Sequence, residues 1–368
     1  MKNTVMHIVG NRPQFIKLAP VSRVIREKGY KEVIIHTGQH YDENMSEVFF
    51  EQLGIPNPDR NLKVGSGSHA QMTAKAMIEI EKIVLEYSPK SVIVYGDTNS
   101  TLAAALVCSK LNIPISHVEA GPRLNNRKNP EECNRLITDH LSELLFCPDE
   151  ESVVNLKDEG ITEGVYFTGD VMYDSFLYCS SNNKECSRSI VEKYELEKDK
   201  FILMTWHRQE NTSSRDRMFK IINFISEINS KIIFPIHPRT LNMLGKYDLI
   251  EYIENIKNLI LIAPLGYIEI VELLSNCKLV LTDSGGLSKE SVFGGTKCLF
   301  MLENSPWMNL ENIGWISTID FNDDKSIEKV LDIANSAYRD ENSDVPMFFG
   351  NGKAASKIVS VLEDKKLI

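Results

Sequence analysis

Three acidic residues stand where predicted strands give way to polar loops or helices. Asp97 and Glu119 each follow an apolar run, over residues 91–95 and 114–118, and Glu131 follows a proline that opens a helical stretch. Taken singly, each carboxylate could simply cap a helix or interact favourably with the helix dipole. Gathered at one edge of a sheet, carboxylates raise one another's pKa, which provides a protonated acid beside an ionised base. Their positions therefore predict acid/base chemistry.

Two cations follow the first apolar run of the chain. Arg12 and Lys17 flank Pro13, which suits the first turn of a helix because no backbone donor is lost there. A helix N-terminus already favours anions. We therefore expect Arg12 and Lys17 to lie near a negatively charged substrate, although two solvated cations at a helix start would give the same pattern.

The second half of the chain supplies further cations and hydrogen-bond donors. His207 and Arg208 follow the apolar run 201–205, and His237 follows another. A lone histidine is more often a structural hydrogen-bonding group than a catalyst, but each of these directly follows a predicted strand and has an arginine close by. Ligands of doubly wound folds bind beyond the carboxyl ends of strands. We therefore expect His207 and Arg208 to contact the substrate.

The clearest local motif is a glycine pair after the apolar run 279–282. Ser284, Gly285 and Gly286 stand where a strand ends and a helix begins. Glycines let the backbone approach a ligand, and a helix N-terminus presents N–H groups to anions. This predicts a phosphate cradle, with Glu290 placed further along the helix to hold ribose hydroxyls, as acidic residues do in dinucleotide sites. A plain glycine-rich turn would also fit these residues.

Short β-branched runs alternate with longer amphipathic stretches through most of the chain, which is typical of right-handed βαβ units. The predicted strands are 6–10, 32–37, 91–95, 114–118, 144–147, 165–168, 201–205, 231–235, 259–262, 279–282 and 297–301. The stretch 179–184 is polar and rich in turn formers, which suggests a linker. We therefore predict an α/β fold of two Rossmann-like, doubly wound domains facing each other across a cleft, over residues 1–171 and 172–353.

Composition excludes several classes of protein. The length of 368 residues suits two domains, and a net charge of −10 without a basic block argues against nucleic-acid or membrane-surface partners. Seven scattered cysteines have no metal-ligand spacing, which favours a reducing cytoplasm and no metal site. Neither a dehydrogenase Gly-x-Gly-x-x-Gly nor a Walker loop is present, so common nicotinamide and ATP chemistries are disfavoured.

These residues alone predict a two-domain enzyme that holds a nucleotide diphosphate in one half and presents carboxylates to the attached group in the other. They do not separate a nucleotide-sugar isomerase from a glycosyltransferase.

Taken together, the motifs resemble those of the non-hydrolysing UDP-N-acetylglucosamine 2-epimerase family. They are Gly10-Asn11-Arg12-Pro13, His36-Thr37-Gly38-Gln39-His40, Gly96-Asp97-Thr98, His117-Val118-Glu119-Ala120-Gly121, residues 130–135, His207-Arg208 and residues 283–286. Residues 41–50 and 169–172 look most like the branch acting on UDP-2,3-diacetamido-2,3-dideoxyglucuronate. The resemblance implies the glycosyltransferase-B type of fold, in which the final helix, within residues 354–368, packs back onto the first domain.

The resemblance also implies a reaction. Such enzymes invert C2 of a UDP-2-acetamido sugar by eliminating UDP to give a 2-acetamidoglucal and then adding UDP back, for surface polysaccharide precursors. The matching positions are Asp97, Glu119 and Glu131 for acid and base, His207 near the diphosphate, Arg12 and Lys17 near the substrate, Arg208 in the histidine motif, Ser284, Gly285 and Gly286 for the diphosphate, Glu290 for ribose and Tyr267 for uracil. The resemblance also implies a homodimer that requires no metal or redox cofactor.

One departure concerns the substrate. After the run 297–301 the family usually reads Arg-Asp-x-Thr-Glu, whereas this chain reads Leu302-Glu303-Asn304-Ser305-Pro306-Trp307. An arginine near the sugar or phosphate side is missing, which leaves the exact substrate open.

Three further functions stay open at this point. A hydrolysing 2-epimerase would release free sugar and UDP, and such enzymes typically read Arg-Ala-Asp in place of residues 12–14. A glycosyltransferase of the same fold would not need three carboxylates gathered in the first domain. A non-catalytic nucleotide-sugar sensor would bind without turnover.

Overall fold

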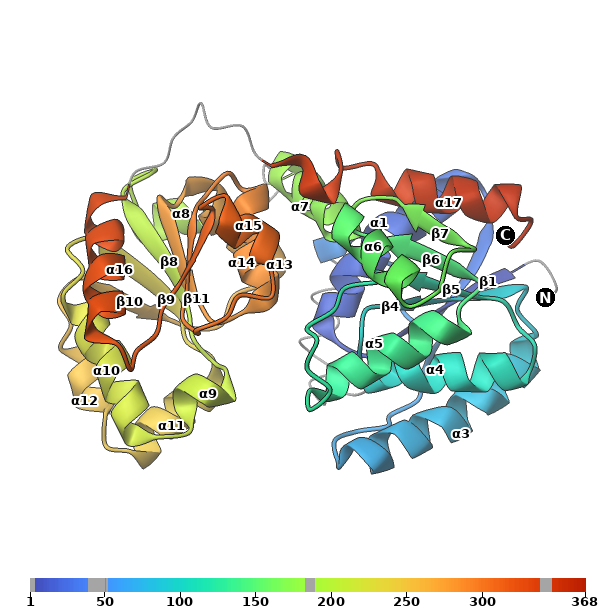
Figure 1. Ribbon diagram of the computed structural model, residues 1–368, viewed down its shortest axis with the longest axis horizontal. Coiled ribbons are helices and arrows are strands. Elements are labelled where there is room, and N and C mark those ends of the chain that lie inside the picture. Colours follow the sequence, from blue (N-terminus) through green and yellow to red (C-terminus); the bar gives the residue numbers. More distant parts are fainter. Residues whose placement is uncertain (1–3, 39–49, 51, 183–188, 338–345) are drawn as a thin grey trace. The chain divides into compact units, whose positions relative to one another are not determined.

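The computed structural model describes residues 4–38, 50, 52–182, 189–337 and 346–368. The chain forms two compact units, Met1–Tyr178 with Met347–Ile368 and Cys179–Pro346, each of which is described by itself below (Figure 1). Motif residues 39–49 fall outside the described ranges.

The division between the units lies inside helix α7 (Val171–Asn182), later than the predicted boundary after residue 171. This helix continues into the stretch 179–184 that we expected to be a linker. The reason is its apolar spacing, because Val171, Met172, Phe176 and Cys179 are all buried along one side of the helix. Residues 183–188 lie outside the described ranges.

The first unit is built on a parallel sheet in the order β3-β2-β1-β4-β5-β6-β7. Its strands are β1 (Thr4–Val9), β2 (Lys31–His36), β3 (Arg60–Asn61), β4 (Ser91–Tyr95), β5 (Ile115–Val118), β6 (Leu144–Cys147) and β7 (Val165–Phe167). The strand order reverses between β1 and β4, because β1 pairs with both β2 and β4. Ligand sites of such sheets lie beyond the carboxyl ends of the strands at this switch point.

Helices cover both faces of this sheet. They are α1 (Arg12–Glu27), α3 (His69–Tyr87), α4 (Asn99–Lys110), α5 (Pro130–Leu141), α6 (Glu150–Asp158) and α17 (Ala354–Asp364). Helices α3 and α4 bury their apolar stripes against one face in a continuous core. The final helix, α17, red in Figure 1, lies against α1, and the Lys28 ammonium is 2.6 Å from the Glu363 carboxylate.

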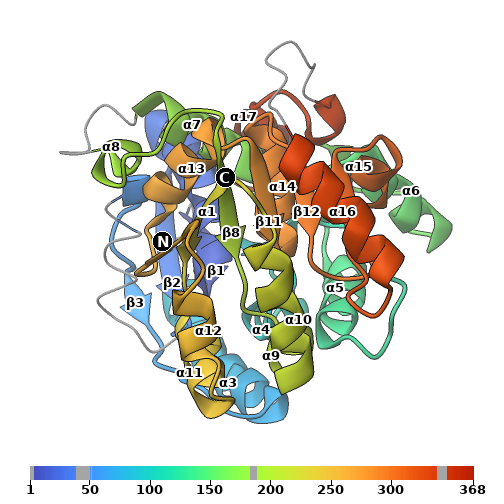
Figure 2. The same ribbon diagram turned by 90° about the vertical axis from the view of Figure 1, so that its left-hand side faces the viewer.

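The second unit repeats the plan with the order β10-β9-β8-β11-β12-β13. Its strands are β8 (Phe201–Thr205), β9 (Lys231–Pro235), β10 (Leu259–Ile262), β11 (Leu279–Thr282), β12 (Cys298–Phe300) and β13 (Ile316–Thr318). Its helices are α8 (Ile190–Lys193), α9 (Gln209–Thr212), α10 (Arg215–Ser226), α11 (Pro238–Lys246), α12 (Ile250–Glu254), α13 (Tyr267–Asn276), α14 (Gly285–Phe293), α15 (Met308–Asn312) and α16 (Asp324–Ser336). Helices α10, α12 and α16, nearest the viewer in Figure 2, form one core with the sheet. Here the order reverses between β8 and β11.

The prediction of two Rossmann-like parallel domains is confirmed. The predicted strands were largely correct, and the two missed ones, β3 and β13, are short edge strands of two and three residues. None of the helices in the described ranges combines the length and apolar character that crossing a bilayer requires.

Candidate functional site

In the first unit, the N-terminus of α1 is anchored at the ends of β1 and β4. The Gly10 N–H donates to the Gln14 side-chain oxygen at 2.7 Å, and the Gln14 amide donates to the Tyr95 carbonyl, also at 2.7 Å. Asn11 caps the helix by accepting the Gln14 N–H. Arg12, at the first helical position, is half-buried just beyond the end of β1. The predicted anion-favouring helix start is therefore present at the switch point of this sheet.

Lys17 is the partner of Glu119. Its ammonium lies 2.7 Å from the Glu119 Oε1 atom, and Lys17 is only 6% exposed. The φ of Gly96 is +60°, which favours glycine, and a Cβ atom there would come within 2.9 Å of the Lys17 ammonium. Lys17, one turn into α1, is therefore paired with Glu119. The sequence motif alone did not indicate this pairing.

The Glu119 backbone is strained. Its φ of 69° puts a non-glycine residue in the left-handed region, and its N–H donates to the Phe146 carbonyl at 3.1 Å. Such conformations cost about 1–3 kcal/mol and persist where surrounding structure holds them, commonly at functional sites. This left-handed conformation ends β5, whose last residue is Val118, directly before Glu119.

Asp97 is held by α5. Arg135 bridges the Asp97 carboxylate and, at 2.9 Å, the Glu132 carboxylate, while the Asn134 amide donates to the Asp97 carbonyl at 2.8 Å. Burial alone would lower the pKa of Arg135, but the charge of Asp97 and the hydrogen bond to Glu132 outweigh it and raise that pKa. Arg135 therefore stays cationic beside Asp97, and it is a site residue that the sequence reasoning did not single out.

The consecutive glutamates of α5 have different surroundings. Glu131 is exposed in the first turn, where its N–H donates to the Asn129 cap at 2.8 Å. Glu132 is buried and accepts the N–H groups of Leu124 and Asn125 at 3.0 and 2.9 Å. Glu132 therefore holds the loop before α5, and Glu131 remains the one with solvent access.

In the second unit, a buried carboxylate orients the histidine motif. Asp283 follows β11, is completely buried, and accepts the backbone N–H groups of His207 and Arg208 at 3.1 and 2.9 Å. The His207 Nδ1 atom is 3.4 Å from the same carboxylate, and its ring centroid lies 5.5 Å from that of His237. The His207 side chain is 39% exposed, so it is oriented yet accessible. The position of Asp283 directly after β11 is the sequence signal that could have identified it.

The glycine pair begins α14 as predicted. Ser284 caps the helix through its hydroxyl, which accepts the Leu287 N–H at 3.3 Å. A Cβ atom at Gly285 would meet Pro306 at 3.1 Å and the Arg208 guanidinium at 3.7 Å, so Arg208 lies beside the helix start. The first N–H groups of a helix have no intrahelical partner. Donors and a cation thus meet at this strand end.

The segment that departs from the family pattern, residues 302–307, contacts this helix start through Trp307. The Trp307 indole N–H donates to the Gly285 carbonyl at 2.6 Å. The ammonium of buried Lys289 lies 4.5 Å from the centre of the Trp307 ring. On the same helix the Glu290 carboxylate accepts the Tyr267 hydroxyl at 2.6 Å, so these two predicted contacts of the nucleoside are neighbours.

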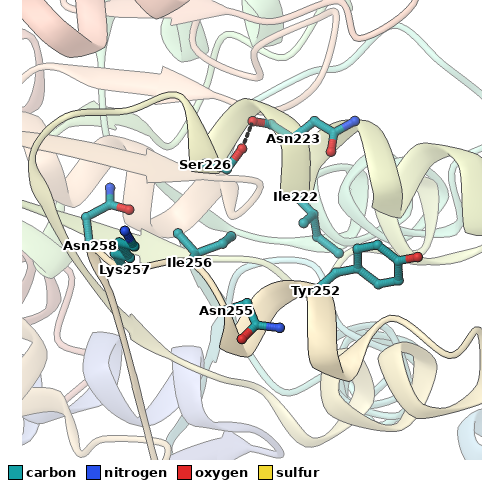
Figure 3. Close-up of a pocket in the computed structure, with 8 residues that line it drawn as sticks. All are labelled: Ile222, Asn223, Ser226, Tyr252, Asn255, Ile256, Lys257 and Asn258. Carbon is teal, nitrogen blue, oxygen red and sulfur yellow. Dashed lines mark hydrogen bonds between the residues drawn. The ribbon is translucent and has the colours of Figure 1, made fainter.

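A pocket of about 340 Å³ lies at the other end of the second sheet (Figure 3). Ile256, Lys257 and Asn258 line it just before β10 begins, and Tyr252 lies beside them. It therefore lies at the amino ends of the strands, away from the residues that follow β8 and β11. Among the described residues, no cluster of three or more His, Cys, Asp or Glu side chains could hold a metal ion.

Comparison with known proteins assigns the family. The family model for UDP-N-acetylglucosamine 2-epimerase matches residues 23–363. A UDP-N-acetylglucosamine 2-epimerase homolog of Methanococcus maripaludis is 47% identical over 98% of this chain and 99% of its own. The UDP-2,3-diacetamido-2,3-dideoxy-D-glucuronate 2-epimerase of Pseudomonas aeruginosa is 40% identical over 97% of this chain and 99% of its own. The Methanocaldococcus jannaschii UDP-GlcNAc 2-epimerase, solved in complex with UDP-GlcNAc and UDP, has a TM-score of 0.88 and 37% identity over 98% and 99% of the two chains.

These similarities extend over nearly the whole chain, and they confirm both the two-domain glycosyltransferase-B fold class and the resemblance found in the motifs. The chain belongs to the UDP-N-acetylglucosamine 2-epimerase family of isomerases.

Proposed function

We propose that this protein inverts C2 of a UDP-2-acetamido sugar, with UDP-N-acetylglucosamine as its first candidate substrate. The C2 proton is not next to a carbonyl, so direct removal is slow. Elimination of UDP across C1–C2 gives a 2-acetamidoglucal, and re-addition of UDP after protonation on the opposite face gives the epimer. The reaction needs a base, an acid and stabilisation of the departing UDP.

The acid and base are proposed to be carboxylates of the first unit. Asp97 and Glu119 follow neighbouring strands, and each has a cationic partner, Arg135 and Lys17. The cation of each pair orients its carboxylate. Exposed Glu131 belongs to neither of these two pairs and is the third candidate. The proposal does not depend on which of the three carboxylates removes the C2 proton and which returns one.

The leaving UDP is proposed to be stabilised by the second unit. His207 and Arg208 follow β8, and the α14 N-terminus follows β11, on either side of the switch point. Backbone N–H groups and a guanidinium are the donors that a diphosphate prefers. Tyr267 and Glu290 are assigned to the nucleoside.

The observation that carries the proposal is the paired carboxylates at adjacent strand ends in a member of this family. A glycosyltransferase would not need them. The diacetamido uronate is the second candidate substrate, supported by the 40% identity to the Pseudomonas enzyme. We further propose a cytoplasmic homodimer that serves surface polysaccharide synthesis.

Incubation with each nucleotide sugar in heavy water tests the function. Epimerisation through elimination puts deuterium at C2 of the true substrate and its epimer, detected by NMR and mass spectrometry. Accumulation of free sugar and UDP would indicate a hydrolysing enzyme instead. Absence of exchange with both sugars, while UDP still binds, would contradict an epimerase and favour a sensor.

A further inference from the structure

A buried histidine connects the loops that carry the two paired carboxylates. His117 lies in β5, two residues before Glu119, and is completely buried. Its Nε2 atom is 2.7 Å from the carbonyl oxygen of Gly96, the residue before Asp97. Its Nδ1 atom is 2.6 Å from the Asp139 carboxylate on α5. The ring therefore spans from the end of β4 to α5.

The two partners determine where the ring carries protons. The Gly96 carbonyl can only accept, so the 2.7 Å contact requires a proton on Nε2. The Asp139 carboxylate also accepts the Gly121 N–H at 3.2 Å, and the Arg123 guanidinium lies 2.7 Å from it. An acceptor surrounded by donors requires a proton on Nδ1 as well. His117 is then an imidazolium.

The Asp139 carboxylate is suited to hold this cation. Burial would raise the pKa of Asp139, but the charges and hydrogen bonds of His117 and Arg123 outweigh it and lower that pKa. Arg123 is paired in turn with Glu159 at 2.7 Å. The charged groups around the ring therefore alternate in sign, and the opposite side of the ring faces the Gly96 carbonyl.

We propose that His117 is a doubly protonated positioning residue that holds the Asp97 and Glu119 loops in register through Gly96 and Asp139. This role rests on the proposed epimerase function. The ring touches neither carboxylate that handles the sugar. It holds the carbonyl before Asp97 directly, while Asp139 holds the Gly121 N–H beyond Glu119. A loop displacement of about 1 Å can cost about 100-fold in rate.

The protonation state is measured on the wild-type protein. Long-range proton–nitrogen NMR spectra of nitrogen-15 histidine-labelled protein report which ring nitrogens carry protons. We expect protons on both ring nitrogens of His117, whose ring signals are assigned by through-bond correlation to the sequentially assigned backbone of the wild-type protein. A neutral ring with one bare nitrogen would overturn the proposal whatever the enzyme's activity.

Two substitutions separate the contacts of His117. Gln places an amide nitrogen near Nε2 and retains the Gly96 contact, whereas Asn places one near Nδ1 and retains only Asp139. We expect kcat to fall about 100-fold in His117→Asn but only about 10-fold in His117→Gln, with KM within about 3-fold of wild type. Equal losses in both, or losses that track thermal unfolding, would show a purely structural role.

If neither variant folds, the wild-type spectrum decides. An inactive wild type would contradict the proposed function, and the NMR result would still stand, so the two failures are distinguishable.

Discussion

At the scale of residues, each candidate carboxylate has a partner or position that suits a distinct task. Asp97 is bound by Arg135, Glu119 by Lys17, and Glu131 is exposed at a helix start. Arg135 is the least replaceable of the partners, because it bridges Asp97 and buried Glu132 at once. Its planar fork can serve two carboxylates, which an ammonium cannot do in the same geometry.

Arg135→Ala is expected to lower kcat by about 100-fold, since Asp97 loses its orientation. It should also cost about 1–3 kcal/mol of unfolding free energy because buried Glu132 is left without its cation. Arg135→Lys retains the charge and should recover stability more than activity. Turnover assays and urea titrations of both variants test this, and an Ala variant with wild-type kcat would contradict it.

At the scale of elements, α5 aligns the site along one helix. Glu131, Arg135 and Asp139 are four residues apart and so share a face.

Another helix depends on a distant cap. Helix α17 has no side-chain cap of its own at Lys353, and Asp174 of α7 accepts the N–H groups of Ala354 and Ala355 at 3.1 and 2.8 Å. The cap joins two chain segments far apart in sequence.

The cap is sensitive to pH. Burial raises the pKa of Asp174 from 3.8 to about 6, so the folded protein binds this proton more tightly than the unfolded chain. This contribution to stability is therefore complete below pH 3.8 and is lost as the pH rises through about 6. We expect the wild type to lose about 1–2 kcal/mol more than Asp174→Asn between about pH 4 and pH 7.

Urea unfolding of both proteins across this range measures the difference. Asp364→Asn removes an exposed carboxylate of α17 and is the matched control. Identical pH dependence of the wild type and Asp174→Asn would refute the assignment.

At the scale of the whole molecule, binding and proton transfer are assigned to different units. The residues proposed for UDP all lie in Cys179–Pro346, and the carboxylates proposed as acid and base, Asp97, Glu119 and Glu131, all lie in the other unit. The two functions should therefore separate under mutation.

Asp97→Asn is expected to lose about 1,000-fold in turnover while binding UDP normally. His207→Asn should weaken UDP binding about 10- to 100-fold, since one oriented donor to a charged group is lost. Titration calorimetry with UDP and turnover assays make the comparison. Asn255→Ala, in the pocket at the amino ends of the second sheet, should change neither. Loss of UDP binding in Asp97→Asn would contradict the division.

Much of this architecture was predictable because it depends on local periodicity. Alternating β-branched runs and amphipathic stretches predicted the parallel sheets, and residues following the central strands were identified as candidates because strand ends of parallel sheets collect ligands. The helical spacing of Val171, Phe176 and Cys179 was also readable, but the polar residues after them concealed it.

Residue type and order alone determined which groups of this protein stand at strand ends, and the motifs determined its family. Tertiary structure decided their partners, because ion pairs such as Lys17 with Glu119 join residues distant in the chain. It also decided that Glu132 is buried while Glu131 is exposed, and that His117 bonds a carbonyl before one carboxylate and a helix beyond the other. Such contacts arise from packing between elements, for which a single sequence carries no periodic signal.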